Sequence, residues 1–328
     1  METARKQVTY AMHFSYSLMT AGTANSEFTF RGWNLSVALQ LGRVSNLPTV
    51  WTNTLAAIVL SGASTSALNL TLLLAAMSFA YIGGMYLNDA FDRKIDTAER
   101  PERPIPSKQV SATDVFVAGF SMLGISTMLV GLVASSANTT GLALLSAVAL
   151  NIAIVGYNVW HKGNPASPLL MGLCRLLVYV TCALAITAEP DKAVFIGAMI
   201  TLAYLIGLTY TAKQEQLGHV STLWPLLFLA APLVFGVINS TASLITAAIS
   251  ALLLAWIGYC LKLIFRRQAG DIPRAVVSLI AGISLVDGVL IAVAASAAYS
   301  LTLSLMLTAA TIGAFALTLK LQRYIAGT

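Results

Sequence analysis

Charged residues are scarce in this sequence, because only 10% of its 328 residues are Asp, Glu, Lys or Arg while 57% are hydrophobic. Soluble domains carry about 25% charged residues, so this scarcity excludes an ordinary soluble protein and indicates a membrane protein. Cysteine is equally rare. Cys174, Cys182 and Cys260 all lie in apolar stretches, and none has a histidine at metal-ligand spacing. They are therefore predicted to be small core residues.

A secretory signal is absent from residues 1–34, which mix charged residues with Ser and Thr and contain no short apolar core followed by a cleavage site. We expect a cytoplasmic N-terminal segment over residues 1–34 and a single transmembrane domain over residues 35–328. The net charge of +6 does not predict a nucleic-acid partner, because Lys and Arg collect in the cytoplasmic loops of membrane proteins.

Long apolar segments dominate the rest of the chain. A membrane-spanning helix needs roughly 20 apolar residues, and ten segments approach or exceed that length. The last two segments are joined by only a few residues, so the sequence predicts an all-α, polytopic helical bundle of nine to ten transmembrane helices. The ten segments cover residues 47–63, 68–88, 112–134, 139–158, 166–187, 193–212, 222–238, 241–263, 275–297 and 299–320.

The positive charges are distributed very unevenly between alternate loops. If the N-terminus is cytoplasmic, only Lys192 of the 19 Lys and Arg residues falls in an outer loop and only Arg175 falls within a helix, which leaves 17 on the inner side. This bias predicts that both termini are cytoplasmic, in what we expect to be a bacterial inner membrane. It also gathers the polar chemistry on one side, which suits an enzyme with a charged, water-soluble co-substrate better than a transporter with polar groups at the midplane.

One acidic stretch has the pattern of a metal site. Residues 86–107 read YLNDAFDRKIDTAERPERPIPS, in which Asp89, Asp92 and Asp96 stand three and seven residues apart and so share one helix face, with Asn88 beside them. Oxygen ligands of this kind suit Mg²⁺, which usually also binds substrate phosphates. The alternative interpretation is a solvated charged loop at a helix end.

The string N-D-x-x-D-x-x-x-D followed by R-P-x-P-S resembles the first aspartate-rich motif of the UbiA superfamily of intramembrane prenyltransferases. The resemblance implies helices around a central cavity with a cytoplasmic cap, and transfer of a polyisoprenyl group from its diphosphate to a lipid-soluble aromatic or other ring acceptor. It further implies that Asn88, Asp92 and Asp96 bind Mg²⁺, that Asp89 supports catalysis, and that Arg103 braces the loop or the diphosphate.

Two further stretches resemble the same family. The segment from Tyr157 to Lys162 resembles the end of the family's fourth helix, which implies that both residues line the cavity or hold the diphosphate. The alternative is an aromatic belt with a lysine that reaches the interface, and His161 is interpreted as an interfacial residue. Arg43 and Asn46, just before the first helix, resemble the family's polar entry to that helix, and Arg43 is a candidate substrate ligand.

The family's second aspartate-rich motif is only partly present. Lys213 is in register with the family's lysine, but Gln214 stands where the first Asp is expected, and Glu215 is the only carboxylate. A Y-x-x-K-x-E pattern of this kind is similar to that of a divergent, EboC-like branch. One Mg²⁺ with Lys162, Lys213 and Arg103 could neutralise the leaving diphosphate. Because the aspartates of the second motif are missing, a non-catalytic protein that binds or exports prenyl lipids is the alternative interpretation. Asp89 or Glu215 is the candidate acceptor of the released proton.

Two ionisable residues lie within the predicted helices. Arg175 and Asp287 interrupt apolar segments, and such residues cost roughly 3 kcal/mol or more in lipid unless they face a cavity or a partner. Arg175 is predicted either to bind an anion near the cavity or to pair with Asp287 or backbone carbonyls, and Asp287 is predicted to be structural. Asn53 and Asn151 line the same cavity or form polar contacts between helices.

Overall fold

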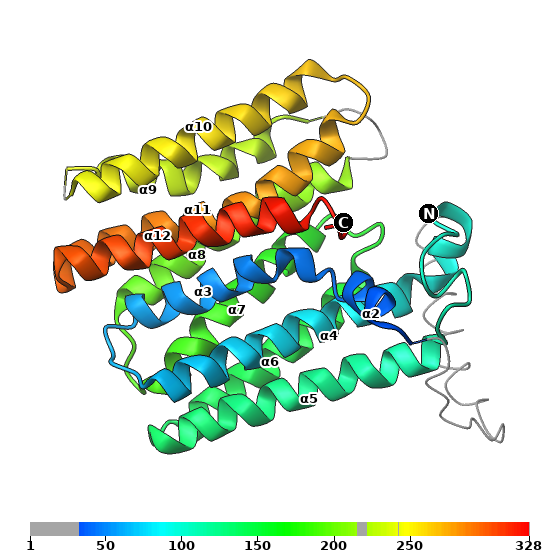
Figure 1. Ribbon diagram of the computed structural model, residues 1–328, viewed down its shortest axis with the longest axis horizontal. Helices are drawn as coiled ribbons and strands as arrows, with labels where there is room; N and C mark the ends of the chain where they lie inside the picture. The colour runs from blue at the N-terminus through cyan, green and yellow to red at the C-terminus, as the bar shows by residue number, and fades with distance from the viewer. Residues whose placement is uncertain (1–32, 215–221, 242, 328) are drawn as a thin grey trace. The chain divides into compact units, whose positions relative to one another are not determined.

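The computed structural model contains two units, residues 1–31 and residues 32–328. Within the second unit it describes residues 33–214, 222–241 and 243–327. These residues form helices joined by turns and short loops, with no strand among them (Figure 1). The predicted N-terminal segment lies almost wholly outside the described residues, as does Glu215.

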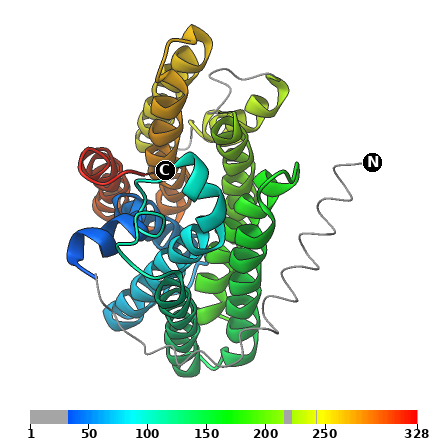
Figure 2. The ribbon, with the colours of Figure 1, turned by 90° about the vertical axis from the view of Figure 1, so that its right-hand side faces the viewer.

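The helices run back and forth between two ends of a bundle, and Figure 2 shows many of them nearly end-on. In chain order they are α2 (Leu35–Leu41), η1 (Val44–Asn46), α3 (Leu47–Leu60), α4 (Ala67–Glu99), α5 (Ala112–Ser136), α6 (Thr140–Trp160), α7 (Ser167–Ile186), α8 (Lys192–Lys213), η3 (Trp224–Ala230), α9 (Ala231–Ile238), α10 (Leu244–Arg266), α11 (Asp271–Ala298) and α12 (Leu301–Leu321).

Each of the ten predicted apolar segments is helical, so the prediction of an all-α polytopic bundle is confirmed. Eight of the described helices are long and apolar enough to cross a membrane, which identifies an integral membrane protein. The first segment, α3, has only 14 residues, and the seventh is split into η3 and α9. Pro232, in the first turn of α9, contributes to the split because proline cannot donate a hydrogen bond to the preceding turn.

Helix α4 is longer than the apolar pattern predicts. The pattern ends near residue 88, but the helix continues to Glu99 and carries the whole acidic motif. The motif's aspartates remain helical because they face the bundle, where each is at most 6% exposed. The helix ends where Arg100 precedes Pro101, since a residue before proline avoids helical backbone angles.

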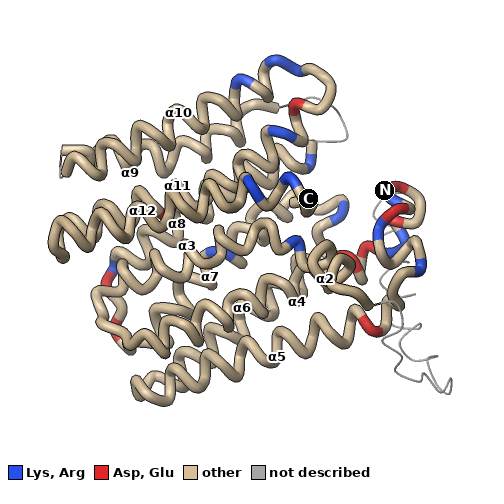
Figure 3. The backbone as a smooth tube through the Cα atoms, viewed as in Figure 1, with Lys and Arg blue, Asp and Glu red and all other residues tan. Residues whose placement is uncertain are grey.

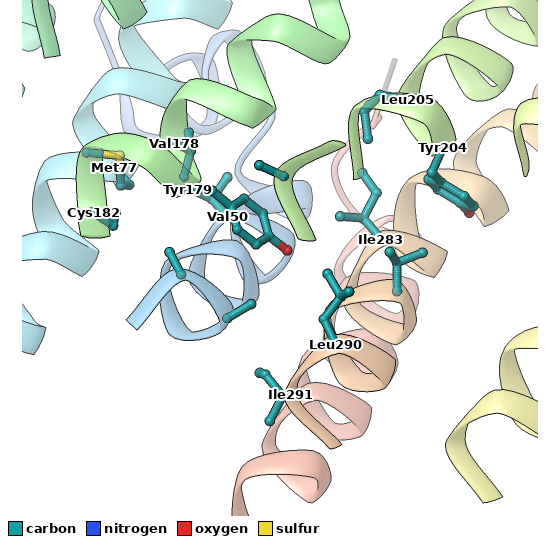
Figure 4. Packing of buried hydrophobic residues seen from close by; sticks show 14 of the residues in the cluster. Val50, Met77, Val178, Tyr179, Cys182, Tyr204, Leu205, Ile283, Leu290 and Ile291 are labelled. Atoms are coloured by element: carbon teal, nitrogen blue, oxygen red, sulfur yellow. The ribbon is translucent and has the colours of Figure 1, made fainter. Parts of the chain in front are cut away.

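Helices α11 and α3 form the centre of this unit. The apolar span of α11 is 83% buried, compared with 22% for α12, and α3 packs against α7, α11 and α12. Figure 4 shows part of their core, to which Val50 of α3, Tyr179 of α7 and Leu290 of α11 contribute. Small residues permit this close approach. A Cβ atom on Gly282 would lie 2.6 Å from the Tyr204 hydroxyl oxygen, so α8 and α11 could not pack as they do with a larger residue there.

Most Lys, Arg, Asp and Glu residues among those described lie at one end of the bundle (Figure 3). Polar contacts join the end of α4 to the end of α6, the end of α8 to the start of α7, and the chain after α12 to α11. The α7–α8 loop lies at the opposite end, where the Asp191 backbone N–H donates to the Ser61 carbonyl. The structure therefore places the acidic motif and its surroundings at one polar end, as the charge pattern predicts.

Candidate functional site

The acidic motif forms one face of the last turns of α4. Asn88, Asp89, Asp92 and Asp96 follow each other at the spacing that the sequence predicts, and each is at most 7% exposed. A buried carboxylate is costly unless cationic or hydrogen-bonding partners surround it. The partners of these side chains therefore determine what the face can bind.

Two arginines contact this face from outside α4. Arg43, between α2 and α3, donates to Asn88 Oδ1 at 3.1 Å and to Asp89 Oδ1 at 2.9 Å. Arg103, in the loop after α4, donates to Asp96 Oδ2 at 2.8 Å and to Asp89 Oδ1 at 3.4 Å. Burial lowers the pKa of Arg43, but the Asp89 carboxylate and nearby groups raise it, and the net pKa is raised. Arg43 is thus a permanent cation whose charge Asp89 partly balances.

The end of α6 supplies a second set of partners. His161 Nε2 lies 3.3 Å from Asp92 Oδ2, and Lys162 Nζ lies 3.8 Å from the same oxygen. The Lys162 side chain is 47% exposed, whereas that of His161 is 13% exposed. Tyr157 stacks on His161 with 5.0 Å between the ring centroids. The structure therefore brings Tyr157 and Lys162 beside the acidic face, together with Arg43 and Arg103.

Asn158 and His161 are residues of this site that the motifs did not single out. Asn158 is 3% exposed, accepts from Asn88 Nδ2 at 3.2 Å and donates to the Gly84 carbonyl at 2.9 Å. His161 faces Asp92 rather than only the interface. The signal was present in the spacing, because Asn158 and His161 stand three residues apart at the C-terminal end of α6, where residues so spaced share one helix face.

Lys213, at the end of α8, contacts neutral oxygens. Its Nζ donates to the Asn164 carbonyl at 2.6 Å and to Ser167 Oγ at 3.0 Å, which ties α8 to the loop that follows Lys162. Within the part of the chain that the structure describes, no carboxylate pairs with Lys213. Glu215 lies outside the described residues, so its predicted role stays a prediction.

Arg175 lies on α7 and does not contact the acidic face. Its guanidinium donates to Asn53 Oδ1 at 2.5 Å and to Thr49 Oγ1 at 3.2 Å, and it lies 5.8 Å from the centroid of the Tyr81 ring. Asn53 Nδ2 in turn donates to Asp287 Oδ1 at 2.9 Å. Arg175 and Asp287 are therefore joined through one amide rather than by direct contact.

Asp287 has a complete set of neutral donors. It accepts from Thr52 Oγ1 at 2.5 Å, from Asn53 Nδ2 with both oxygens, and from the Tyr179 hydroxyl. The carboxylate is fully buried. Asn151 likewise makes a polar contact between helices, because its Nδ2 donates to Thr127 Oγ1 of α5 at 2.8 Å.

The oxygen atoms of the acidic face suit a hard divalent cation. Mg²⁺ takes one or two protein carboxylates together with phosphate oxygens and waters, and Asn88, Asp92 and Asp96 offer ligands of that kind. Asp92 faces His161 and Asp96 faces Arg103. Among the described residues, no three His, Cys, Asp or Glu side chains form a preformed metal cage. The face therefore fits Mg²⁺ that arrives with a phosphate ligand better than a structural metal.

The comparisons with known proteins agree on one family. The model of the UbiA prenyltransferase family matches residues 48–283. Among curated relatives, the digeranylgeranylglyceryl phosphate synthase of Methanothrix thermoacetophila is 31% identical over 130 residues, which cover 39% of this chain and 46% of that protein. The synthase of Haloquadratum walsbyi is 32% identical over 130 residues, which cover 39% and 43%. The chain thus matches less than half the length of these two relatives.

Solved structures share the fold. A UbiA homolog from Aeropyrum pernix K1, in its apo form, superposes with a TM-score of 0.60 at 14% identity over 74% of this chain and 94% of that one. A UbiA homolog from Archaeoglobus fulgidus bound to GPP and Mg²⁺ superposes with a TM-score of 0.56 at 15% identity over 86% and 100%. At these identities the likeness concerns the arrangement of the helices.

Proposed function

We propose that this chain, which belongs to the UbiA prenyltransferase family, transfers a prenyl group from its diphosphate to a lipid-soluble acceptor within the membrane. The observation that supports this most is the buried acidic face of α4, whose aspartates face two arginines, a histidine and a lysine. A magnesium diphosphate has the complementary pattern, because its metal suits the carboxylates and its phosphate oxygens suit the cations.

In this proposal Asn88, Asp92 and Asp96 hold Mg²⁺, which neutralises charge on the leaving diphosphate when it is bound. Asp92 and Asp96 contact His161 and Arg103 in the structure. Arg103 lies beside Asp96, where its guanidinium would also be within reach of a phosphate oxygen of the bound diphosphate.

The remaining cations orient the diphosphate. Arg43 and Arg103 can each donate several parallel hydrogen bonds to phosphate oxygens, and the exposed Lys162 can reach them from the rim. Lys213 keeps the adjoining loop in place and adds positive charge. Tyr157 stacks on His161 beside the acidic face, where we propose that it shields the reacting carbon from water.

The bond that breaks joins the first prenyl carbon to the diphosphate oxygen, and its electron pair leaves with the diphosphate. The acceptor's nucleophilic atom then forms a bond to the allylic carbon and releases a proton. Asp89 and Glu215 are the candidate proton acceptors. Asp89 already accepts from both Arg43 and Arg103, so we propose that its first task is to hold these guanidinium groups.

The polar end of the bundle carries the proposed site, so we propose that this end faces the cytoplasm, where water-soluble Mg²⁺ and diphosphate are found. Both termini would then be cytoplasmic, in the bacterial inner membrane that the sequence predicts. Membrane lipids surround the apolar faces, and the acceptor reaches the site from the lipid phase.

The second candidate is a protein that binds prenyl lipids without turnover. The partial second acidic motif, in which Glu215 is the only carboxylate, is the observation in its favour. Such a protein has no need for a divalent cation, whereas the transferase requires one.

The deciding experiment measures diphosphate release by the purified protein from labelled geranyl, farnesyl and geranylgeranyl diphosphates, with a lipid extract as the acceptor source. We expect release that depends on Mg²⁺, with the label moving to a new lipid product, and loss of release in Asp92→Ala. Glu189→Ala is the control, because it removes an exposed acid at the opposite end of the bundle. Tight binding without release would favour the second candidate, and full activity in Asp92→Ala would overturn the metal assignment.

A further inference from the structure

The chain after α12 folds back onto the start of α3. We call residues 322–327 the C-terminal strap. Asn46 Nδ2 donates to the Gly327 carbonyl at 2.8 Å, across a separation of 281 residues, and Gln322 Nε2 donates to Asn46 Oδ1 at 3.0 Å. Asn46 is 3% exposed and Gly327 is buried. The strap thus satisfies both the donor and the acceptor of one buried amide.

The strap is also tied to the central helix. Gln322 Nε2 donates to the Val277 carbonyl of α11 at 3.2 Å, so the strap connects α11 to the start of α3. Residues near the ends of a domain are loosely held unless specific contacts fix them. Here three hydrogen bonds hold the six residues of the strap against the start of α3 and against α11. The strap is therefore positioned by tertiary contacts and not only by its local turn.

The contacts continue from Asn46 to Arg43. Asn46 Nδ2 also donates to the Tyr81 hydroxyl at 3.3 Å, and the Tyr81 hydroxyl donates to the Arg43 carbonyl at 3.4 Å. The Asn46 backbone N–H donates to the same carbonyl at 3.0 Å. The peptide carbonyl of Arg43 is therefore held from two directions, and Asn46 takes part in both.

Arg43 needs such support because of its backbone. Its φ of 43° and ψ of 47° lie in the left-handed region, which residues other than glycine adopt only when the surroundings fix them. This conformation directs the guanidinium back to α4, where it contacts Asn88 and Asp89. A relaxed backbone would move the guanidinium away from the acidic face.

We propose that Asn46, held by the C-terminal strap, is a positioning residue that fixes Arg43 against the acidic face of α4. This inference rests on the proposed function, in which Arg43 binds the diphosphate. Asn46 does not contact the ligand. It acts through the Arg43 backbone, so its effect on affinity disappears when the Arg43 side chain is absent.

The test is a double-mutant cycle on the full chain in lipid nanodiscs, with Mg²⁺ and geranyl diphosphate as the probe and calorimetry as the readout. We expect Asn46→Ala to weaken binding about tenfold, and Arg43→Ala to weaken it at least as much. The combined variant should bind no more weakly than Arg43→Ala alone, because the two residues act in series. Asn69→Ala is the matched control, since it removes an exposed amide at the other end of α4.

A second measurement does not depend on the ligand. Hydrogen exchange of a peptide that contains residues 43–46 should be faster in Asn46→Ala than in the wild type or in Asn69→Ala. Gly327→Ala serves if Asn46→Ala folds poorly, because a Cβ atom there would lie 3.1 Å from Asn46 Oδ1, so that the strap or the Asn46 side chain must shift by a few tenths of an ångström. Its weakening of binding should be smaller and also absent without the Arg43 side chain.

The outcomes separate this inference from the function on which it rests. Additive losses in the cycle, or unchanged affinity with only a lower melting temperature, would overturn the positioning role and leave the transferase proposal intact. If the wild type binds none of geranyl, farnesyl and geranylgeranyl diphosphate, the proposed function fails. Exchange at residues 43–46 then decides alone whether the strap holds Arg43, with unchanged exchange contradicting it.

Discussion

The buried aspartates at the end of α4 and the buried Asp287 in the core have different kinds of polar partner. At the end of α4 the aspartates face cations, as Asp96 does with Arg103 and Asp92 with Lys162, and His161 also contacts Asp92. In the core, the described residues that contact Asp287 are hydroxyl donors and Asn53. Arg175 contacts Asn53 and not Asp287 itself.

The difference indicates which group can bind a ligand. Ion pairs at the polar end include a lysine that is 47% exposed, so a ligand with its own charges can replace them. The Asp287 carboxylate is fully buried and accepts four hydrogen bonds, so it has little capacity left for a new partner. We interpret the first group as a binding site and the second as part of the core.

The largest effect should follow from removing a charge of the acidic face. Asp96→Asn keeps the shape of the side chain but removes one negative charge at the proposed metal site, so we expect turnover to fall by about 10²–10³-fold. Steady-state diphosphate release measures it. Asp191→Asn is the matched control, because asparagine can still cap the start of α8. Equal losses in the two variants would remove the distinction between the two ends of the bundle.

The core acid should affect stability rather than metal binding. Asp287→Ala leaves the Asn53 amide and the Tyr179 hydroxyl without their acceptor and Arg175 without its counter-charge, so we expect the free energy of unfolding to fall by about 3 kcal/mol. The melting temperature in detergent should fall while the Mg²⁺ affinity of the remaining folded protein stays unchanged. A loss of Mg²⁺ affinity at constant stability would mean that Asp287 belongs to the site.

A smaller effect on activity is expected from substitution of Arg103, where replacement by lysine separates the effect of the charge from that of the planar guanidinium. One nitrogen of its guanidinium contacts both Asp89 and Asp96. Arg103→Lys keeps the charge but loses the planar fork that matches phosphate, so we expect KM for the prenyl diphosphate to rise about tenfold with a smaller change in kcat. An unchanged KM would restrict Arg103 to bracing its own loop.

The smallest effect should come from the exposed rim. Lys162→Ala removes a cation that is 3.8 Å from Asp92 and largely open to solvent, where salt screens it. We expect KM for the prenyl diphosphate to rise only a few fold at low salt, and less at high salt. A loss as large as that of Asp96→Asn would show that Lys162 contacts the diphosphate at closer range than the structure places it from Asp92.

The acidic face of α4 could be predicted from spacing alone, because residues three and four positions apart share a helix face. The position where α4 ends could not be predicted from the sequence, because a run of charged residues indicates a loop as long as its tertiary partners are unknown. Those partners are distant in sequence, as Arg43 is separated from Asp89 by 46 residues. His161 could have been included from its spacing to Asn158, but only the contact with Asp92 gives that spacing a meaning.

Composition and apolar length by themselves determined that this protein is a polytopic helical membrane protein, because these properties follow from local patterns and from the bilayer's thickness. The acidic motif predicted the family through its resemblance to a known motif. Tertiary structure alone decided which cations meet which aspartates, that Asn53 stands between Arg175 and Asp287, and that Gly327 closes onto Asn46. These contacts join residues that no local pattern relates, since they depend on how whole helices pack.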